Sequence, residues 1–268
     1  MSHAAITEQE FTQFQKLIYD IAGINLSAAK KPLVSGRLAK RLAHHGAGSY
    51  GDYFRILQKD AGHGELQIAV DLLTTNETYF FRESKHFDFL RDKILPGHRA
   101  GRPFRVWSAA CSSGQEPYTI AMVLADVLGE IPWEVMASDL STRVLERART
   151  GHYALEQAKH VPKHYLGRYC MKGVGAQEGT FLVDRALRSR IKFDQINLNR
   201  SLPQVGEFDV IFLRNVMIYF DTETKQRVVQ RLVGQLKSGG YLMVGHSESL
   251  NGISEGLTVV MPAIYRKP

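Results

Sequence analysis

Two acidic residues occur at positions where the chain could bind a small ligand. Glu116 falls in the first turn of an expected helix, directly after a loop of small residues from Ser108 to Gly114. Such small residues let a ligand approach the backbone closely. Asp139 ends the next apolar strand about 25 residues past Gly114, near the separation at which a second-strand carboxylate reaches ribose hydroxyls. The spacing predicts a strand, loop and helix unit that holds part of a nucleoside.

The loop does not match a dinucleotide fingerprint. It has one glycine, Gly114, where G-x-G-x-x-G has three, and the Glu116 carboxylate would repel a pyrophosphate at the same helix end. A cationic ligand without phosphates fits better, and S-adenosylmethionine, with its sulfonium and α-amino groups, is such a ligand. Structural roles explain the same residues equally well: Glu116 would favour the helix dipole, and Asp139 would cap the helix from Thr142 to Arg149.

A polar and aromatic stretch has the composition of a pocket wall. Residues 74 to 78 are all able to form hydrogen bonds, and they are followed by three aromatic residues and Arg82. Ligand sites combine apolar surface with a few polar groups that fix orientation. Helix capping could account for Asn76 or Thr78 but does not account for Arg82.

Composition limits the remaining possibilities. The chain has 268 residues, enough for two domains, and its apolar runs are far too short to span a bilayer. The N-terminus lacks the pattern of a secretory signal, so we expect a cytoplasmic protein with no direct membrane insertion. Cys111 and Cys170 are expected to be free thiols and suggest no metal site. The net charge of +7 indicates an acidic partner.

Residues 1 to 73 are expected to be entirely helical. In the second helix, which follows Ser27, four basic residues at positions i, i+3, i+4 and i+7 share one face: Arg37, Lys40, Arg41 and His44. We interpret this face as a docking surface for an acidic partner. A solvated surface with no partner is the alternative.

From residue 102 onward, strands and helices alternate, which predicts an α/β domain with a parallel, seven-stranded sheet. A small antiparallel insertion is expected at about 165–190, and a Gly239-Gly240 turn is expected before the strand Tyr241 to Val244. Ligands of open α/β sheets lie beyond the carboxyl ends of the strands. The residues expected at that edge are Ser108 to Gly114, Asp139, Asn197 and Arg214 to Tyr219.

Five stretches in order resemble the chemotaxis receptor methyltransferase family, CheR, and the resemblance covers essentially the whole chain. They are Leu73-Thr-Thr-Asn-Glu-Thr-Tyr-Phe-Phe-Arg-Glu83, Val106-Trp-Ser-Ala-Ala-Cys-Ser-Ser-Gly-Gln-Glu-Pro-Tyr118, Ala137-Ser-Asp139, Phe212-Leu-Arg-Asn-Val-Met-Ile-Tyr-Phe220 and Gly245-His-Ser-Glu248. The resemblance implies a Rossmann-like class I methyltransferase domain at 101–268, a helical receptor-docking domain at 1–73, and a linker with a cofactor-covering helix at 74–100.

The implied activity is protein-glutamate O-methylation. S-adenosylmethionine would supply the methyl group and leave as S-adenosylhomocysteine, and the acceptors would be the cytoplasmic helical domains of methyl-accepting chemotaxis receptors, with a receptor C-terminal peptide as a second ligand at the inserted hairpin. Arg82 and Tyr219 would stand nearest the transferred methyl. The residues that would line the cofactor site are Asn76, Thr78, Arg82, Glu116, Asp139, Asn197, Leu198, Arg214 and Asn215.

Three other functions fit the sequence less well. The single glycine and the Glu116 carboxylate oppose a nicotinamide oxidoreductase. Retention of Arg82, Glu116, Asp139 and Tyr219 together opposes a non-catalytic binding module of methyltransferase ancestry. Only the net charge supports a nucleic-acid methyltransferase, and no N/D-P-P-Y/F follows the central strand, so we expect no nucleic-acid partner.

Overall fold

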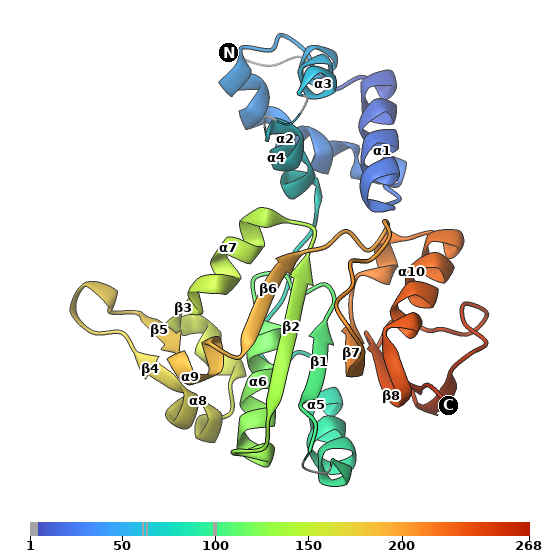
Figure 1. Ribbon diagram of the computed structural model, residues 1–268. Coiled ribbons are helices and arrows are strands. Elements are labelled where there is room, and N and C mark those ends of the chain that lie inside the picture. Colours follow the sequence, from blue (N-terminus) through green and yellow to red (C-terminus); the bar gives the residue numbers. More distant parts are fainter. Residues whose placement is uncertain (1–4, 61, 63, 99–100) are drawn as a thin grey trace. The chain divides into compact units, whose positions relative to one another are not determined.

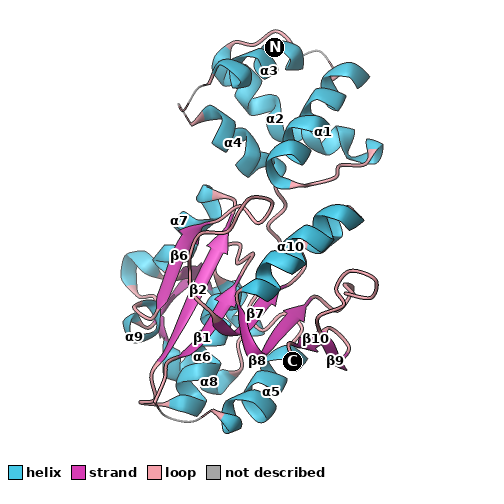
Figure 2. Cartoon of the chain, turned by 45° about the vertical axis from the view of Figure 1, so that its right-hand side comes forward, coloured by secondary structure: helices cyan, strands magenta, loops and turns pink. Residues whose placement is uncertain are grey.

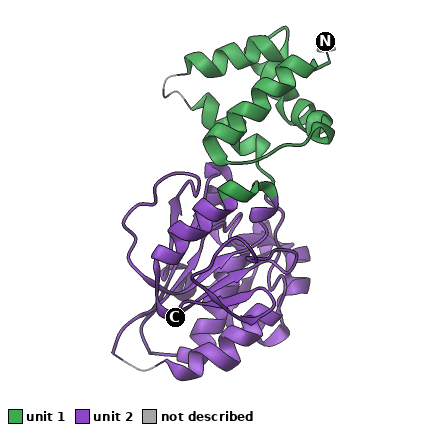
Figure 3. Cartoon of the chain, turned by 90° about the vertical axis from the view of Figure 1, so that its right-hand side faces the viewer, with its two compact units in different colours: residues 1–75, 219–224 green, residues 76–218, 225–268 purple. Residues whose placement is uncertain are grey.

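The computed structural model describes residues 5–60, 62, 64–98 and 101–268 (Figure 1). The chain divides into two compact units (Figure 3). Unit 1 comprises Met1–Thr75 and Tyr219–Thr224, and unit 2 comprises Asn76–Ile218 and Lys225–Pro268. Among the helices of the described residues, none has the length and apolar character needed to cross a membrane.

Unit 1 is a bundle of short helices, as expected for the N-terminal region. Its elements are α1 (Glu8–Ala22), the 3-10 turn η1 (Ala28–Lys30), α2 (Lys31–His45), α3 (Tyr50–Lys59) and α4 (Glu65–Leu73). A capping box between Thr7 and Glu10 starts α1, and Gly23, with φ 72°, ends it. Phe14, Leu38 and similar side chains at helical spacing are fully buried and form the core.

Unit 2 contains a seven-stranded sheet in the order β6-β2-β1-β7-β8-β10-β9 (Figure 2). Five neighbouring strands are parallel, and β10 pairs antiparallel with both β8 and β9. The strands are β1 (Phe104–Ser108), β2 (Trp133–Asp139), β6 (Ile191–Gln195), β7 (Phe208–Leu213), β8 (Leu236–Val244), β9 (Thr258–Met261) and β10 (Ile264–Arg266).

Helices and turns connect these strands. They are α5 (Lys85–Phe89), the π-helical η2 (Leu90–Ile94), η3 (Leu95–Gly97), α6 (Gln115–Leu128), α7 (Thr142–Thr150), η4 (Leu155–His160), α8 (Lys163–Tyr169), η5 (Gly175–Gln177), α9 (Arg185–Arg188), η6 (Met217–Tyr219) and α10 (Thr222–Gly234). Because strand order reverses between β1 and β7, the loops after these two strands flank the switch point at which open α/β sheets bind ligands.

The small antiparallel insertion is confirmed, but it is larger than the expected hairpin. It forms a three-stranded sheet in the order β3-β5-β4, from β3 (His152–Ala154), β5 (Thr180–Val183) and β4 (Cys170–Lys172). The first strand was missed because three residues are too few for alternation of apolar and polar side chains to be visible.

The expected turn at Gly239-Gly240 is wrong. Both glycines lie within β8, where the register against β7 shifts. Gly239 has φ 77°, and a Cβ at Gly240 would lie 2.9 Å from the Lys237 carbonyl oxygen and 3.0 Å from that of Asp209. The two glycines therefore accommodate an irregularity inside a strand. A Gly-Gly pair in a sequence is compatible with such an irregularity and with a turn, so the sequence alone does not distinguish them.

Candidate active site

The loop between β1 and α6 packs against α7 and β3. Ser112 and Gly114 have positive φ values of 49° and 96°. A Cβ at Gly114 would lie 2.7 Å from the Tyr153 hydroxyl and 2.9 Å from the Ala148 Cβ. Only glycine fits there without displacing buried neighbours, so the loop conformation is fixed by packing as well as by backbone geometry.

Glu116, in the first turn of α6, forms a buried ion pair with Arg214. One carboxylate oxygen accepts from the Ser108 hydroxyl at 2.7 Å, and the other accepts from Arg214 Nη1 at 2.7 Å. The Glu116 side chain is 12% exposed and that of Arg214 is 2% exposed. Arg214 Nε is buried and has no hydrogen-bond partner among the described residues. A fixed negative and a fixed positive charge thus lie side by side at the switch point.

Asp139 ends β2 and connects two loops of the same edge. Its Oδ2 accepts from Ser112 N at 2.8 Å and its Oδ1 from Ser141 N at 3.0 Å, with only 8% of the residue exposed. Asp139 therefore binds the backbone of Ser141, the N-cap residue of α7, and also the backbone of the loop after β1. The Ser141 side chain itself makes no capping hydrogen bond.

The segment with the expected pocket-wall composition passes beside this loop. The Asn76 carbonyl accepts from the Ser112 hydroxyl at 2.8 Å. Asn76, Thr78 and Arg82 are half-buried. Arg82 donates to the Glu77 carbonyl at 2.7 Å and lies 5.7 Å from the Tyr79 ring centroid. The Arg82 carbonyl accepts from Arg214, which joins this segment to the end of β7.

Asn197 and Leu198 follow β6. The Asn197 side chain accepts from Asn199 N at 2.9 Å, and the Leu198 carbonyl accepts from Arg231 at 3.0 Å. Leu198 is 8% exposed. The first contact is local and the second joins this loop to α10, and the roles expected for Asn197 and Leu198 toward a cofactor remain predictions.

Asn215, next to Arg214, has φ 57°, an unusual conformation for a residue other than glycine. Two carboxylates that sequence reasoning missed, Glu83 and Glu248, hold this position. Glu83 accepts from Arg214 Nη2 at 3.0 Å and Asn215 Nδ2 at 3.1 Å, and Glu248 accepts from Asn215 N at 2.9 Å. The signal was present, since Glu83 and Glu248 end two of the stretches that carried the family resemblance.

Tyr219 and Arg82, the two residues expected nearest the acceptor, belong to different units. Tyr219 lies in the short segment grouped with unit 1, where its carbonyl accepts from Asn25 N at 2.8 Å. Arg82 belongs to unit 2. Their joint action on a carboxylate remains a prediction.

The four basic residues of α2 differ in their contacts. Arg37 donates to the carbonyls of Leu73 and Thr74 at 3.1 and 2.9 Å, and so caps the C-terminal end of α4. Arg41 forms a salt bridge with the buried Glu65. Lys40 and His44 are exposed. Two members of the predicted docking surface therefore also have structural roles inside unit 1.

Comparison with known proteins assigns the family. The model of the CheR methyltransferase SAM binding domain matches residues 76–264, and that of the CheR methyltransferase all-alpha domain matches residues 9–74. The chemotaxis protein methyltransferase of Escherichia coli is 42% identical over 264 residues, covering 97% of this chain and 91% of that protein.

Two further relatives carry the same description. That of Borreliella burgdorferi is 39% identical, with coverage of 98% of this chain and 95% of that protein. That of Salmonella typhimurium is 40% identical, with coverage of 97% and 91%. With both family models and near full-length relatives in agreement with the carboxyl-edge geometry, the chain belongs to the CheR methyltransferase family and uses S-adenosylmethionine.

Proposed function

We propose that this protein transfers the methyl group of S-adenosylmethionine to glutamate carboxylates of chemotaxis receptors and releases S-adenosylhomocysteine. The relatives named above are chemotaxis protein methyltransferases that match almost the whole chain. The observation that carries the proposal is the Glu116–Arg214 pair at the switch point of a sheet whose family is known to bind this cofactor.

The residues at this edge fit the cofactor. A methionine head group carries one ammonium and one carboxylate, and the adjacent Glu116 and Arg214 offer one charge of each sign. Asp139, at the end of β2, is suited to ribose hydroxyls. We assign Asn76, Thr78, Arg82, Asn197, Leu198 and Asn215 to the rest of the site on the family resemblance. When bound, the cofactor supplies an electrophilic methyl on a sulfonium.

The acceptor needs little activation. A glutamate side chain is ionised at neutral pH and is already a nucleophile, so the protein must mainly align it with the methyl group. We assign Arg82 to hold the acceptor carboxylate and the Tyr219 hydroxyl to orient one of its oxygens. A cation that bound the carboxylate too tightly would lower its reactivity, and one charged and one neutral donor is a compatible combination.

The partner contacts are assigned by charge. Receptor segments that present several glutamates are acidic, and a basic surface on α2 would accelerate encounter and orient the partner. Of the four residues proposed for docking, Lys40 and His44 are exposed and are the ones to test. The three-stranded insertion is assigned to a receptor C-terminal peptide.

A methyl-transfer assay tests this function. Purified protein, radiolabelled S-adenosylmethionine and receptor cytoplasmic fragments should give label that is released as methanol in alkali, since carboxyl methyl esters are base-labile. Fragments with the acceptor glutamates changed to aspartate and a nucleic-acid acceptor serve as controls. Label on nucleic acid, or alkali-stable label on protein, would contradict the proposal.

A further inference from the structure

The turn that follows β7 is held by two carboxylates from distant parts of the chain. Glu83 precedes α5, and Glu248 follows β8. Together their oxygens accept hydrogen bonds from the side chain of Arg214, from both the side chain and the backbone of Asn215, and from Ile218 N. We name Glu83 and Glu248 the carboxylate clamp.

Glu248 holds the backbone of the turn. Only 8% of the residue is exposed. Its Oε2 accepts from Asn215 N at 2.9 Å and Gly245 N at 2.7 Å, and its Oε1 accepts from Ile218 N at 3.2 Å. These bonds join the turn after β7 to the turn after β8. They also hold Asn215 in its left-handed backbone conformation.

Glu83 holds the side chains of the turn. Its Oε2 accepts from Arg214 Nη2 at 3.0 Å and from His246 N at 3.1 Å, while its Oε1 accepts from Asn215 Nδ2 at 3.1 Å. Arg214 uses its other terminal nitrogen, Nη1, for Glu116. The guanidinium is therefore fixed between two carboxylates, and together with the Ser108 hydroxyl it holds the Glu116 carboxylate.

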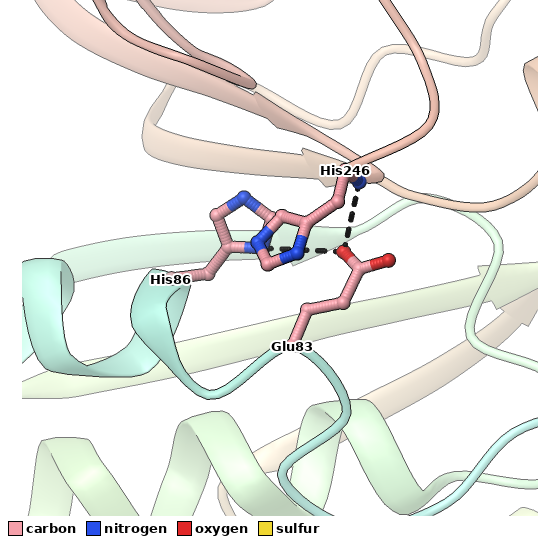
Figure 4. Close-up of side chains that lie close together, drawn as sticks. All are labelled: Glu83, His86 and His246. Atoms are coloured by element: carbon pink, nitrogen blue, oxygen red, sulfur yellow. Dashed lines mark hydrogen bonds and ion pairs between the residues drawn. The ribbon is translucent and has the colours of Figure 1, made fainter.

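The same region contains side chains of the types that bind metal ions. Figure 4 shows the Glu83 carboxylate beside the rings of His86 and His246, and their ligand atoms lie within 4.8 Å of one another. The Glu83 oxygens, however, already accept three N–H donors, and Arg214 lies 3.0 Å from Oε2. A dication would have to be bound next to this guanidinium, so the hydrogen bonds favour a positioning role over a metal site.

We propose that Glu83 and Glu248 are positioning residues that hold Arg214, and through it Glu116, in the arrangement that binds the methionine head group of the cofactor. This inference rests on the proposed function. It requires the clamp to act on the head group and leave the binding of the adenosine moiety intact, because Asp139 is held separately by Ser112 and Ser141.

Calorimetric affinities for two ligands test the clamp. S-adenosylhomocysteine contains the amino-acid head group, whereas 5′-methylthioadenosine lacks it. Glu83→Gln should weaken S-adenosylhomocysteine binding about tenfold or more, the effect of one lost charge-assisted hydrogen bond, and should leave methylthioadenosine binding unchanged. Glu255→Gln, an exposed carboxylate of the same unit, is the matched control and should bind both like the parent.

A second variant disturbs the clamp without removing a charge. A Cβ at Gly245 would lie 2.6 Å from Asn215 Nδ2 and 2.9 Å from Glu248 Oε2. Gly245→Ala should therefore show the same selective loss of S-adenosylhomocysteine binding. This variant tests the clamp even if Glu83→Gln fails to fold.

The outcomes are separable. Equal loss of both ligands in the two variants, as a merely structural role would give, or no loss of either, overturns the inference. If a chelator abolishes S-adenosylhomocysteine binding by the parent protein, and His246→Ala abolishes it as well, Glu83 is a metal ligand. That result likewise overturns the inference. A parent protein that binds neither ligand would instead refute the proposed function.

Discussion

Replacing Arg41 by methionine should destabilise unit 1 strongly, although Arg41 belongs to the predicted docking surface. Glu65, only 7% exposed, accepts from Arg41 Nε at 2.9 Å and from Arg41 Nη2, and also from the Tyr53 hydroxyl at 2.6 Å. His45 Nε2 lies 3.0 Å from the same carboxylate. Burial alone would raise the pKa of Glu65. The hydrogen bonds from Arg41, Tyr53 and His45 have the larger opposite effect, and they lower this pKa to about 2. The carboxylate is thus ionised and depends on these donors.

The magnitude follows from the bonds lost. Methionine keeps most of the apolar stem of Arg41, so the main loss is two charge-assisted hydrogen bonds to a buried carboxylate. At about 1.5 kcal/mol each, the lower end for such bonds, the free energy of unfolding should fall by about 3 kcal/mol. That is a large part of the roughly 5–15 kcal/mol that stabilises a typical domain.

Hydrogen exchange resolved to α3 and α4 measures the change, because their slowest amides report the global opening of unit 1. Lys40→Met, on an exposed neighbour in the same helix, is the matched control and should remain within about 0.5 kcal/mol of the parent. An Arg41→Met protein as stable as Lys40→Met would refute the structural reasoning. The expected result means that docking should be tested with Lys40→Glu and His44→Glu, since charge reversal at Arg41 would unfold the surface under test.

Three further predictions concern unit 2 and the acceptor. Glu116→Ala and Asp139→Ala should each weaken S-adenosylmethionine binding by about 1–3 kcal/mol without unfolding the chain, and unchanged calorimetric affinity in both would refute the site assignment. Tyr219→Phe should keep cofactor affinity and lose turnover, so a parent-like rate of receptor methylation would exclude the orienting role. Burial, with Arg214 and His246 nearby, lowers the pKa of His86 to about 3. Because this pKa is below the unfolded value of about 6.5, the proton-linked stability is present above pH 6.5 and is lost as pH falls toward 3. Between pH 7 and pH 5 it should amount to about 2 kcal/mol in urea unfolding, and His86→Phe should remove that part of the pH dependence.

The position of the candidate site could be predicted because it depends on local patterns. The strands that end at Ser108, Asp139 and Leu213 are visible as apolar runs, and parallel strands place their carboxyl ends at one edge of a sheet. Glu116, Asp139 and Arg214 could therefore be assigned to one region of unit 2, whereas Tyr219, expected at the same edge, is grouped with unit 1. Element boundaries such as the start of β8 were less accessible, since a bulge and a turn use the same residues.

The partners of charged residues could not be predicted in the same way. Arg214 and Glu83 are 131 residues apart in the chain, and Arg41 and Glu65 are 24 apart. Helical periodicity places Arg41 on a face, but it does not say whether the guanidinium turns toward solvent or toward a neighbouring helix. The one available sign was Glu65 itself, an acidic residue at the start of a largely apolar helix.

Two buried glutamates and one half-buried glutamate show why such partners decide what a carboxylate does. Glu65 and Glu83 each pair with an arginine, and the pKa of both is lowered although burial acts in the opposite direction. Burial raises the pKa of Glu248, which accepts hydrogen bonds from the backbone N–H groups of Gly245, Asn215 and Ile218. The neutral backbone donors of Glu248 do not offset its burial, whereas an arginine together with other donors does so for Glu65 and Glu83. Glu248 accepts from backbone N–H groups and fixes the turn, whereas Glu83 fixes the same turn and also binds the Arg214 guanidinium, which donates to Glu116 through its other terminal nitrogen. Within the carboxylate clamp, Glu248 therefore fixes the backbone conformation of the turn, and Glu83 also binds the positive charge of Arg214, although both residues are glutamates.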